Sequence, residues 1–439
     1  MADLLALSRR FIDEGMEQST GGFGSANRIN FELSEVADGL AVVESFSHVV
    51  AFDSGDGLVL FDTSLDVFGP AMVKAVRGWR TDAVNTLVYT HGHIDHVGGA
   101  SAFLADAQER GRQRPAVIGH DHVARRFDRY DLTNGYNAVI NERQFGTSAK
   151  RGSASDGGDD SPASFPRDWV RPTVTYRDEL THRVGDLELA FHHALGETDD
   201  HTWTWIPSHR AVCVGDLLVW VFPNAGNPQK VQRYPLEWAQ ALRQIALLEP
   251  ELLLPAHGLP IDGRQRIQVV INDVATALEL LVGQVLEMMN AGSTLDDIIH
   301  SVTLPGDLLA KPYLQATYDE PEFVVRNIWR AYGGWYDGNP ARLKPPSDRS
   351  IAVETASLAG GIEVLVARAN DLAQAEDFRL ACHLIELAAQ ADPDDIGAQR
   401  ARASIYQQRR QVETSLMAKG IYGWASRESD VAVNAKRTD

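Results

Sequence analysis

Short apolar, β-branched runs alternate with amphipathic stretches over roughly the first 260 residues of the chain. Apolar runs bounded by turn residues are typical of buried strands, and longer stretches with apolar residues every three or four positions are typical of helices. The pattern predicts helices over 69–80 and 100–110, and strands over 40–46, 48–52, 58–63, 85–89, 116–120, 185–194, 210–216 and 251–258. This order of elements predicts an α/β fold.

From about residue 265 the pattern becomes helical. Apolar residues recur at helical spacing over 269–289, 295–300, 323–331, 361–373, 375–391 and 394–408. We therefore predict a catalytic domain over residues 1–265, an all-α domain over 266–425 and a tail over 426–439. The last helix pairs resemble helical-hairpin repeats, but they are too few for a solenoid.

An unusual segment, 131–166, interrupts the first domain. Its first part, 131–146, combines amides, aromatic residues and one arginine, whereas 147–166 is rich in Ser, Gly and Asp. Long insertions in compact domains tend to be functional, so we predict that 131–146 lines the active site and that 147–166 is a mobile loop. The predicted substrate contacts are Tyr136, Asn137, Asn141 and Arg143, the last because its planar fork suits an anion. The alternative is a solvated surface excursion that carries an ordinary surface arginine.

The charge and cysteine content narrow the possible partners. The chain of 439 residues has a formal net charge of -19, which argues against nucleic acid or an anionic membrane as a partner. Cys213 and Cys382 each lie among apolar residues, as core thiols do in a reducing compartment. The N-terminal apolar run precedes its arginines, the reverse of a secretory signal, and no apolar run is expected to span a membrane. We predict a cytoplasmic protein with a small-molecule substrate.

The segment after the predicted strand 85–89 concentrates metal-ligand chemistry. It reads His91-Gly92-His93-Ile94-Asp95-His96-Val97-Gly98-Gly99, so three imidazoles and one carboxylate fall within six residues. Imidazole nitrogen and carboxylate oxygen are the ligands that zinc accepts most readily. Because alternate residues of a turned loop share a side, the set can divide between two metals. The alternative is a polar loop that happens to be rich in histidine.

Other predicted strands also end in ligand-type residues. Asp62 ends the strand 58–63, Glu197 follows 185–194, Asp216 ends 210–216 and His257 ends 251–258. Sites in α/β folds are built at such C-terminal strand ends, although strand-end acids also serve as simple caps. His120 and His122 follow another strand, and we interpret them as surface or loop histidines.

The pattern His-x-His-x-Asp-His-x-Gly-Gly after a buried strand resembles the signature of the metallo-β-lactamase superfamily. That resemblance implies an αββα sandwich, in which Asp62 supports the metal loop without binding metal. Two further features resemble the alkylsulfatases of this fold. Glu197 stands where the superfamily usually has histidine, with the acid Asp216 nineteen residues beyond it. The stretch Trp335-Tyr336-Asp337-Gly338-Asn339-Pro340 is similar to one in the helical dimerisation domain of that family.

The resemblance, which covers residues from about 40 to 420, implies a dizinc hydrolase that cleaves alkyl sulfate esters and forms a homodimer. It places His91, His93 and Glu197 on one zinc, Asp95, His96 and His257 on the other, and Asp216 between them. Asp95 and Asp216 are then expected to hold the water that the metals activate. Two divalent metals would also give this acidic protein a local attraction for an anionic ester.

Three departures from the alkylsulfatase pattern bear on the substrate. Asp216 replaces a glutamate, and Gly-Glu-Thr at 196–198 replaces Gly-Thr-Glu. Segment 217–224 replaces a segment rich in threonine and histidine that helps to hold sulfate. Within it we expect Trp220 to contact an apolar part of the substrate. The alternatives are another hydrolase of this fold, such as a phosphodiesterase, lactonase or thioesterase, or a non-catalytic relative that keeps the metals for structure.

Overall fold

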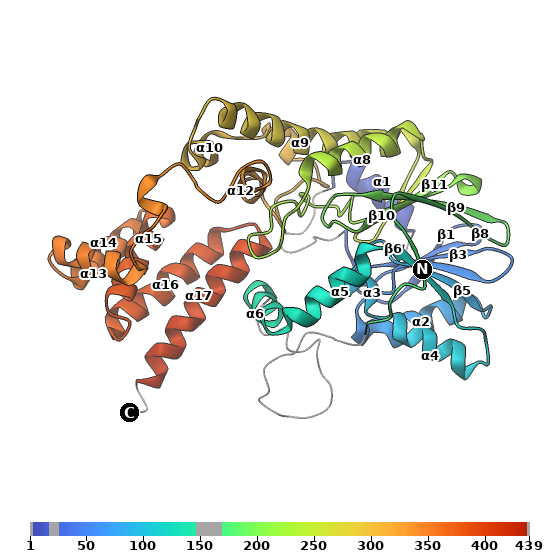
Figure 1. Cartoon of the computed structure of the whole chain (residues 1–439), viewed down its shortest axis with the longest axis horizontal. Coiled ribbons are helices and arrows are strands. Elements are labelled where there is room, and N and C mark those ends of the chain that lie inside the picture. Colours follow the sequence, from blue (N-terminus) through green and yellow to red (C-terminus); the bar gives the residue numbers. More distant parts are fainter. Residues whose placement is uncertain (1–2, 17–25, 146–168, 437–439) are drawn as a thin grey trace. The chain divides into compact units, whose positions relative to one another are not determined.

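The computed structural model describes residues 3–16, 26–145 and 169–436, which form two compact units (Figure 1). The first unit holds the described residues up to Ala138 and those from 169 to Trp335. The second holds residues 139–145 and 336–436. The segment 147–166, predicted to be mobile, lies outside the described residues. The boundary predicted at 265/266 marks the change from strands to helices, whereas the compact units divide at 335/336 and within one helix.

Two sheets build the first unit. The seven-stranded sheet runs in the order β1 to β7, and β4, β5, β6 and β7 are parallel neighbours. Its strands are β1 (Leu33–Ala37), β2 (Leu40–Val43), β3 (Val49–Asp53), β4 (Leu58–Phe61), β5 (Val84–Val88), β6 (Ala116–His120) and β7 (Val174–Tyr176). The six-stranded sheet has the order β13-β12-β11-β10-β9-β8, with β11 parallel to β12. Its strands are β8 (Glu179–Val184), β9 (Leu187–Ala194), β10 (His201–Ile206), β11 (Ala211–Gly215), β12 (Leu252–Pro255) and β13 (Ile261–Asp262).

Strand side chains alternate between two cores, as the period of two requires. Phe52 of β3 packs in one core with Phe191 of the other sheet, whereas its neighbour Ala51 packs in a second core with Met72 of α2. Helices cover the outer faces of both sheets (Figure 1). They are η1 (Asp66–Phe68), α2 (Gly69–Trp79), α3 (Ile94–Val97), α4 (Ala100–Glu109), α5 (His122–Leu132), α8 (Pro235–Leu247) and α9 (Arg264–Asn290). The predicted αββα sandwich is confirmed.

The helices at the edge of this unit close its core. They are α1 (Leu4–Asp13), η2 (Pro207–His209), α10 (Leu295–Ser301), α11 (Gly306–Leu309) and α12 (Pro321–Tyr332). Among the described residues, α9 is long and apolar enough to cross a membrane, contrary to the sequence-based expectation. The bent pair α13 (Asp348–Ala359) and α14 (Ile362–Gln374) passes only as a broken span. Half of the apolar window of α9 is buried inside the protein. A core helix has the same composition, because it packs on several sides.

The second unit is helical, as predicted. Its helices are α13 (Asp348–Ala359), α14 (Ile362–Gln374), α15 (Phe378–Ala391), α16 (Ile396–Val412) and α17 (Leu416–Ala435), preceded by η3 (Pro340–Arg342). Small residues such as Ala369, Ala381 and Ala388 line their shared core, which lets the helices approach closely. Helix α6 (Asn134–Phe145) crosses between the units, since its last seven residues belong to the second.

Candidate metal centre

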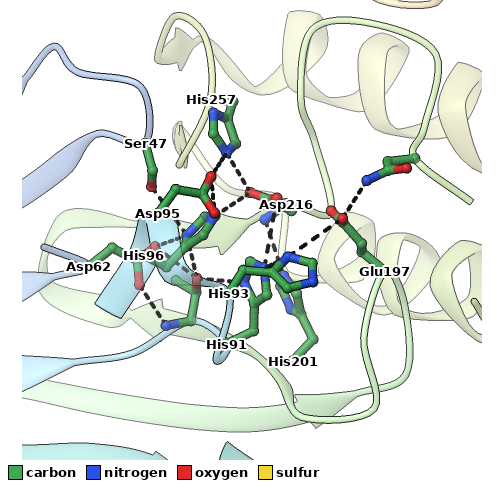
Figure 2. Close-up of polar contacts among 12 residues, drawn as sticks. Ser47, Asp62, His91, His93, Asp95, His96, Glu197, His201, Asp216 and His257 are labelled. Carbon is green, nitrogen blue, oxygen red and sulfur yellow. Dashed lines mark hydrogen bonds and ion pairs between the residues drawn. The ribbon is translucent and has the colours of Figure 1, made fainter. Parts of the chain in front are cut away.

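Loops at the C-terminal ends of strands bring seven ligand-type side chains together (Figure 2). The loop after β5 carries His91 and His93, the short helix α3 that follows carries Asp95 and His96, and the other three follow β9, β11 and β12. Because parallel strands end at the same edge, residues far apart in sequence meet there. The seven residues are His91, His93, Asp95, His96, Glu197, Asp216 and His257.

The ligand atoms form two groups. In the first, His91, His93, Glu197 and Asp216 each offer an atom within 4.8 Å of the others. The His91 Nε2 to His93 Nδ1 distance is 2.8 Å, and His93 Nδ1 lies 3.6 Å from Glu197 Oε1. In the second group, Asp95 Oδ2 lies 3.5 Å from His96 Nε2 and 3.3 Å from His257 Nε2. The structure thus brings together the residues predicted for each metal, and their assignment to two metals stays a prediction.

Asp216 lies between the groups. Its Oδ2 is 3.9 Å from His91 Nε2, while its Oδ1 is 3.5 Å from the Nε2 atoms of both His96 and His257. Its position follows from β11, which ends at Gly215 with a φ of 52°. A side chain at Gly215 would meet Thr90 and His201, so only glycine allows the turn that aims Asp216 inward.

The donor set fits divalent cations. Among the described residues, His96 Nε2 and Asp216 Oδ1 are buried and have no hydrogen-bond partner, although they face each other at 3.5 Å. Buried polar atoms without partners are rare in folded proteins and call for a ligand. Imidazole nitrogens with carboxylate oxygens are the donors that zinc and similar metals prefer.

Asp62 contacts His96 at Nδ1, the ring nitrogen that does not face the other ligands. The carboxylate accepts from Thr90 N and Thr90 Oγ1, both at 2.8 Å, and lies 2.7 Å from His96 Nδ1. Burial raises the pKa of Asp62, while His96 and the two Thr90 donors act in the opposite direction, and His96 Nδ1–H donates to the carboxylate. The lone pair of His96 is then on Nε2, which faces the centre. Asp62 therefore does more than cap its strand.

Burial and mutual repulsion set the charges of the centre. Burial raises the pKa of Glu197 well above its ordinary value, with further repulsion from Asp216, while the neighbouring Arg233 opposes the shift. Burial lowers the pKa of His91 well below its ordinary value. Although burial also acts on His96, the carboxylates of Asp216, Asp95 and Asp62 raise its pKa well above the ordinary value. Bound cations would neutralise this concentration of carboxylates.

Sequence reasoning missed a buried support beneath the first group. Asp200 Oδ2 accepts from Gly92 N at 3.0 Å and from Arg126 Nε at 2.9 Å, so Arg126 and Asp200 together hold the metal loop. His201 stacks on His91 with a centroid distance of 5.1 Å and accepts at Nε2 from Asp216 N. Asp199-Asp200-His201 was visible as a polar run, but nothing in its spacing revealed an arginine from α5.

Glu197 is fixed by two further residues that the sequence did not single out. Arg233 is 2% exposed, lies 3.3 Å from Glu197 Oε1 through its Nη2, and donates from Nη1 to the Glu197 carbonyl. Asn224 Nδ2 donates to Glu197 Oε1. Both come from the segment between β11 and α8, which encloses this side of the centre.

Four of the predicted substrate contacts lie on one helix, α6, whose residues are divided between the two compact units. Tyr136 and Asn137 lie in the first unit, with Tyr136 60% exposed, while Asn141 and Arg143 lie in the second. The Arg143 guanidinium lies 6.0 Å from the ring centroid of Trp424 in α17. The role of these four residues in substrate binding stays a prediction.

Trp220 has a different environment from the one expected. It is fully buried, its Nε1 donates to Leu259 O at 2.8 Å, and its ring packs edge-on against Phe11. Its φ of 56° turns the side chain into the core, against Gly258. Trp220 therefore supports the loop that carries His257 instead of facing a substrate.

Two family models match the chain. The model described as metallo-beta-lactamase superfamily matches residues 42–257, and the one described as alkyl sulfatase dimerisation matches residues 294–431. A linear primary-alkylsulfatase from Pseudomonas sp. is 26% identical over 78% of this chain and 66% of its own length. The alkyl/aryl-sulfatase BDS1 of Saccharomyces cerevisiae is 22% identical over 82% of this chain and 58% of its own length.

A solved structure shows the same fold. The stereoselective inverting sec-alkylsulfatase Pisa1 from Pseudomonas sp. superposes with a TM-score of 0.78 at 23% identity, over 91% of this chain and 65% of that one. The chain spans 57 to 66% of the length of the curated relatives it matches. The chain thus has the metallo-β-lactamase fold and is similar to alkylsulfatases, and its helical residues 294–431 match the model described as alkyl sulfatase dimerisation.

Proposed function

We propose that this protein is a dizinc hydrolase that cleaves alkyl sulfate esters into an alcohol and sulfate. The observation that carries the proposal is Asp216, whose two oxygens face two separate groups of ligands in a chain with alkylsulfatase relatives. Zinc is the metal that best suits a set of four imidazoles and three carboxylates. When bound, such a pair of ions lowers the pKa of water and offsets anionic charge.

The exposure of the ligands indicates where a substrate enters. The side chains of His93 and Asp95 are 19% and 17% exposed, whereas those of the other five ligands are at most 6% exposed. Asp95 thus lies on the open face, where its carboxylate can orient a water molecule and accept its proton. Asp216 shares this role from the buried side.

One cation lies near this open face. Burial lowers the pKa of Lys230 to about 8, while the carboxylates of Glu197 and Asp95 act in the opposite direction. The electrostatic interaction with both acids is the observation that supports a role for Lys230 near the ligands. We assign Lys230 to attraction of the ester anion, a role that the sequence had suggested for Arg143.

A turnover panel tests the reaction class. Purified protein loaded with zinc should hydrolyse medium-chain alkyl sulfates faster than aryl phosphodiesters or lactones. Asp216→Asn should abolish this turnover, because one uncharged amide cannot serve both groups. Faster turnover of a lactone or a phosphodiester would indicate that the protein is another kind of hydrolase of this fold. No turnover of any class by fully loaded protein would favour a non-catalytic relative.

The position of bond cleavage follows from the same assay. Reaction in oxygen-18 water labels the alcohol if the C–O bond breaks and labels sulfate if the S–O bond breaks. Mass spectrometry of both products distinguishes the two, and the stereochemistry of a secondary alcohol gives a second, independent readout.

We also propose that the protein is a cytoplasmic homodimer. The support is the matched dimerisation region together with exposed apolar side chains in and around it. Trp335 is 73% exposed, Leu343 50% and Leu358 81%. Large apolar side chains at such exposure are typical of an interface, and a stable homodimer buries on the order of 2,000 Å².

A further inference from the structure

Strand β6 leads directly into helix α5 (Figure 1). A second cluster of ligand-type side chains lies at this junction. His120 ends the strand, His122 begins the helix, and Asp121 separates them. One ligand atom from each residue lies within 4.8 Å of those of the other two. The sequence had suggested surface histidines with no ligand-type neighbour, and it overlooked Asp121.

Hydrogen bonds fix the tautomer of His120. Its Nδ1 accepts from the backbone N–H of His122 at 3.2 Å, and its Nε2 lies 2.8 Å from the carbonyl of Arg177. Because a backbone N–H only donates, Nδ1 carries the lone pair and Nε2 carries the hydrogen. Burial lowers the pKa of His120 to about 4, so the ring is neutral at ordinary pH. This is how metal-binding histidines are usually held, with the far N–H on a backbone carbonyl.

The tautomer of His122 is fixed in the opposite sense. Its Nε2 accepts from the Arg125 guanidinium at 3.0 Å, since arginine only donates, and its Nδ1 lies 3.2 Å from the carbonyl of Asp199. Nδ1–H therefore donates to that carbonyl, and the lone pair is on Nε2. The two histidines thus present one lone pair each, from different ring positions.

Both of these ring nitrogens lie near one carboxylate oxygen. Asp121 Oδ1 lies 3.6 Å from His120 Nδ1 and 3.6 Å from His122 Nε2. This oxygen is buried and has no hydrogen-bond partner among the described residues. The other oxygen, Oδ2, accepts from the exposed Arg177 at 3.2 Å, so the carboxylate is oriented. Ligands of one tetrahedral zinc lie roughly 3.3 Å apart, as zinc–nitrogen bonds of about 2.0 Å require.

We propose that His120 Nδ1, Asp121 Oδ1 and His122 Nε2 form a further divalent-cation site, which takes Zn²⁺ and leaves a fourth position for water. The N-terminus of α5 disfavours a cation with about half a unit of positive charge, but the full negative charge of Asp121 exceeds it. A bound ion would replace two weak contacts. One is the long 3.2 Å hydrogen bond from the His122 N–H to His120 Nδ1, and the other is the exposed contact from Arg125 to His122 Nε2.

An ion in this position would affect the loop that carries Glu197. The carbonyl of Asp199 accepts from both His122 Nδ1 and His193 Nε2, and its carboxylate contacts Arg126. Fixing His122 therefore fixes the chain two residues after Glu197. We assign the site a structural role, since its three ligands lie outside the seven of the main centre.

Counting zinc in the full-length protein tests the proposal without relying on activity. Protein loaded with Zn²⁺ and then desalted should hold about one ion more per chain than the Asp121→Asn and His122→Gln variants, by mass-spectrometric metal analysis. His192→Gln is the matched control, because this histidine stacks on Trp203 outside the cluster. Thermal unfolding of each zinc-loaded protein verifies folding, and X-ray anomalous scattering at the zinc edge locates the ion.

The result is separable from the proposed dinuclear function. If the main centre binds fewer ions than proposed, the zinc content of the parent protein and of every variant is lower by the same number. The difference of one ion between the parent and the two cluster variants then persists. Equal zinc content in the parent protein and in both variants, with no anomalous peak at Asp121, would overturn the proposal. Loss of the ion in His192→Gln as well would also overturn it, since that change leaves all three ligands in place.

Discussion

His96 and Asp62 form a buried pair, in which Nδ1 of the imidazole lies 2.7 Å from the carboxylate. The pair explains why an acid at the end of β4 matters for a metal loop that begins after β5. Asp62 has a φ of 58°, a strained value for a residue other than glycine, and the carboxylate is aimed by that turn.

Replacing Asp62 should therefore weaken metal binding without removing a ligand. Asp62→Asn should lower zinc affinity about 10- to 100-fold, as loss of partners behind metal-bound histidines usually does. Competition with a chromophoric chelator measures the change. Asp56→Asn, at an exposed turn of the same sheet, is the control. Unchanged affinity in Asp62→Asn would remove the supporting role assigned to the pair.

Gly258 permits the close approach of Trp220, and alanine there should disrupt the His257 loop. A Cβ at Gly258 would lie 2.3 Å from Trp220 Cδ1, and its φ of 95° adds backbone strain. Strain alone costs about 1 kcal/mol, and overpacking adds about 1–3 kcal/mol. Gly258→Ala should thus lower both the unfolding midpoint and the zinc content. Gly292→Ala isolates the strain, because that site has a φ of 83° and open space. Equal effects of the two substitutions would contradict the packing argument.

Removing Arg233 should destabilise the metal-free protein more than the metal-loaded one. Arg233 is the buried cation beside Glu197, and an unpaired buried carboxylate costs about 3–5 kcal/mol. A bound metal would replace the missing positive charge. Thermal unfolding of Arg233→Met with and without zinc should therefore show a larger metal-induced increase in midpoint than the parent shows.

The control for that experiment is an exposed arginine. Arg171 pairs with Asp128, and their side chains are 48% and 64% exposed, so Arg171→Met should cost less than about 1 kcal/mol in either state. An Arg233→Met variant with the same metal-induced increase as the parent would show that Arg233 does not compensate Glu197.

Acid should destabilise the metal-free protein through His48. Burial lowers the pKa of His48 from 6.5 to about 3. Between these values the unfolded chain binds a proton that the folded chain does not, so the unfolding free energy falls as pH falls, by at most about 1.4 kcal/mol per pH unit. The thermal unfolding midpoint should decrease less between about pH 7 and about pH 5 in His48→Gln than in the parent protein. His300→Gln, at a largely exposed histidine, should leave that decrease unchanged.

Self-association should depend on the exposed apolar residues of the dimerisation region. Light scattering should give the parent a mass about twice its chain mass of 48.2 kDa. The double variant Trp335→Ser and Leu358→Ser should shift the mass toward a single chain, because large apolar anchors dominate interface energy. Leu247→Ser removes an equally exposed leucine of α8, which is 83% exposed, and should leave the mass unchanged. A parent mass of one chain would refute the homodimer.

The α/β class and the candidate ligands at strand ends could be predicted from local pattern, whereas the αββα sandwich was implied by the family resemblance. Glu197, Asp216 and His257 each follow within a few residues of a strand that the apolar pattern predicts. The chain order of these strand ends, compared with that of the family, indicated that they join the metal loop. The predicted helix over 69–80 corresponds to α2 within one residue.

Contacts made by unpredictable turns could not be derived in this way. The segment that holds Trp220 follows Asp216, so its position in sequence indicated a substrate contact. Its positive φ, however, turns the indole into the core, and no sequence pattern reports that angle. Arg126 reaches Asp200 from α5 across 74 residues, a pairing that only the folded chain reveals.

Helix α6 has a consequence for how the protein can be divided. Its last residues pack in the second unit, where a side chain on Gly420 of α17 would lie 2.2 Å from the carbonyl of Gln144. The helical unit is therefore made of two separate stretches of chain, and a polypeptide that starts at Tyr336 lacks about two helical turns of this unit. Expressed alone, it would expose the surface around Gly420 to solvent. To express the helical unit as a separate protein, residues 139–145 must be joined by a linker to the stretch that starts at Tyr336. Circular permutation therefore preserves this unit better than truncation does.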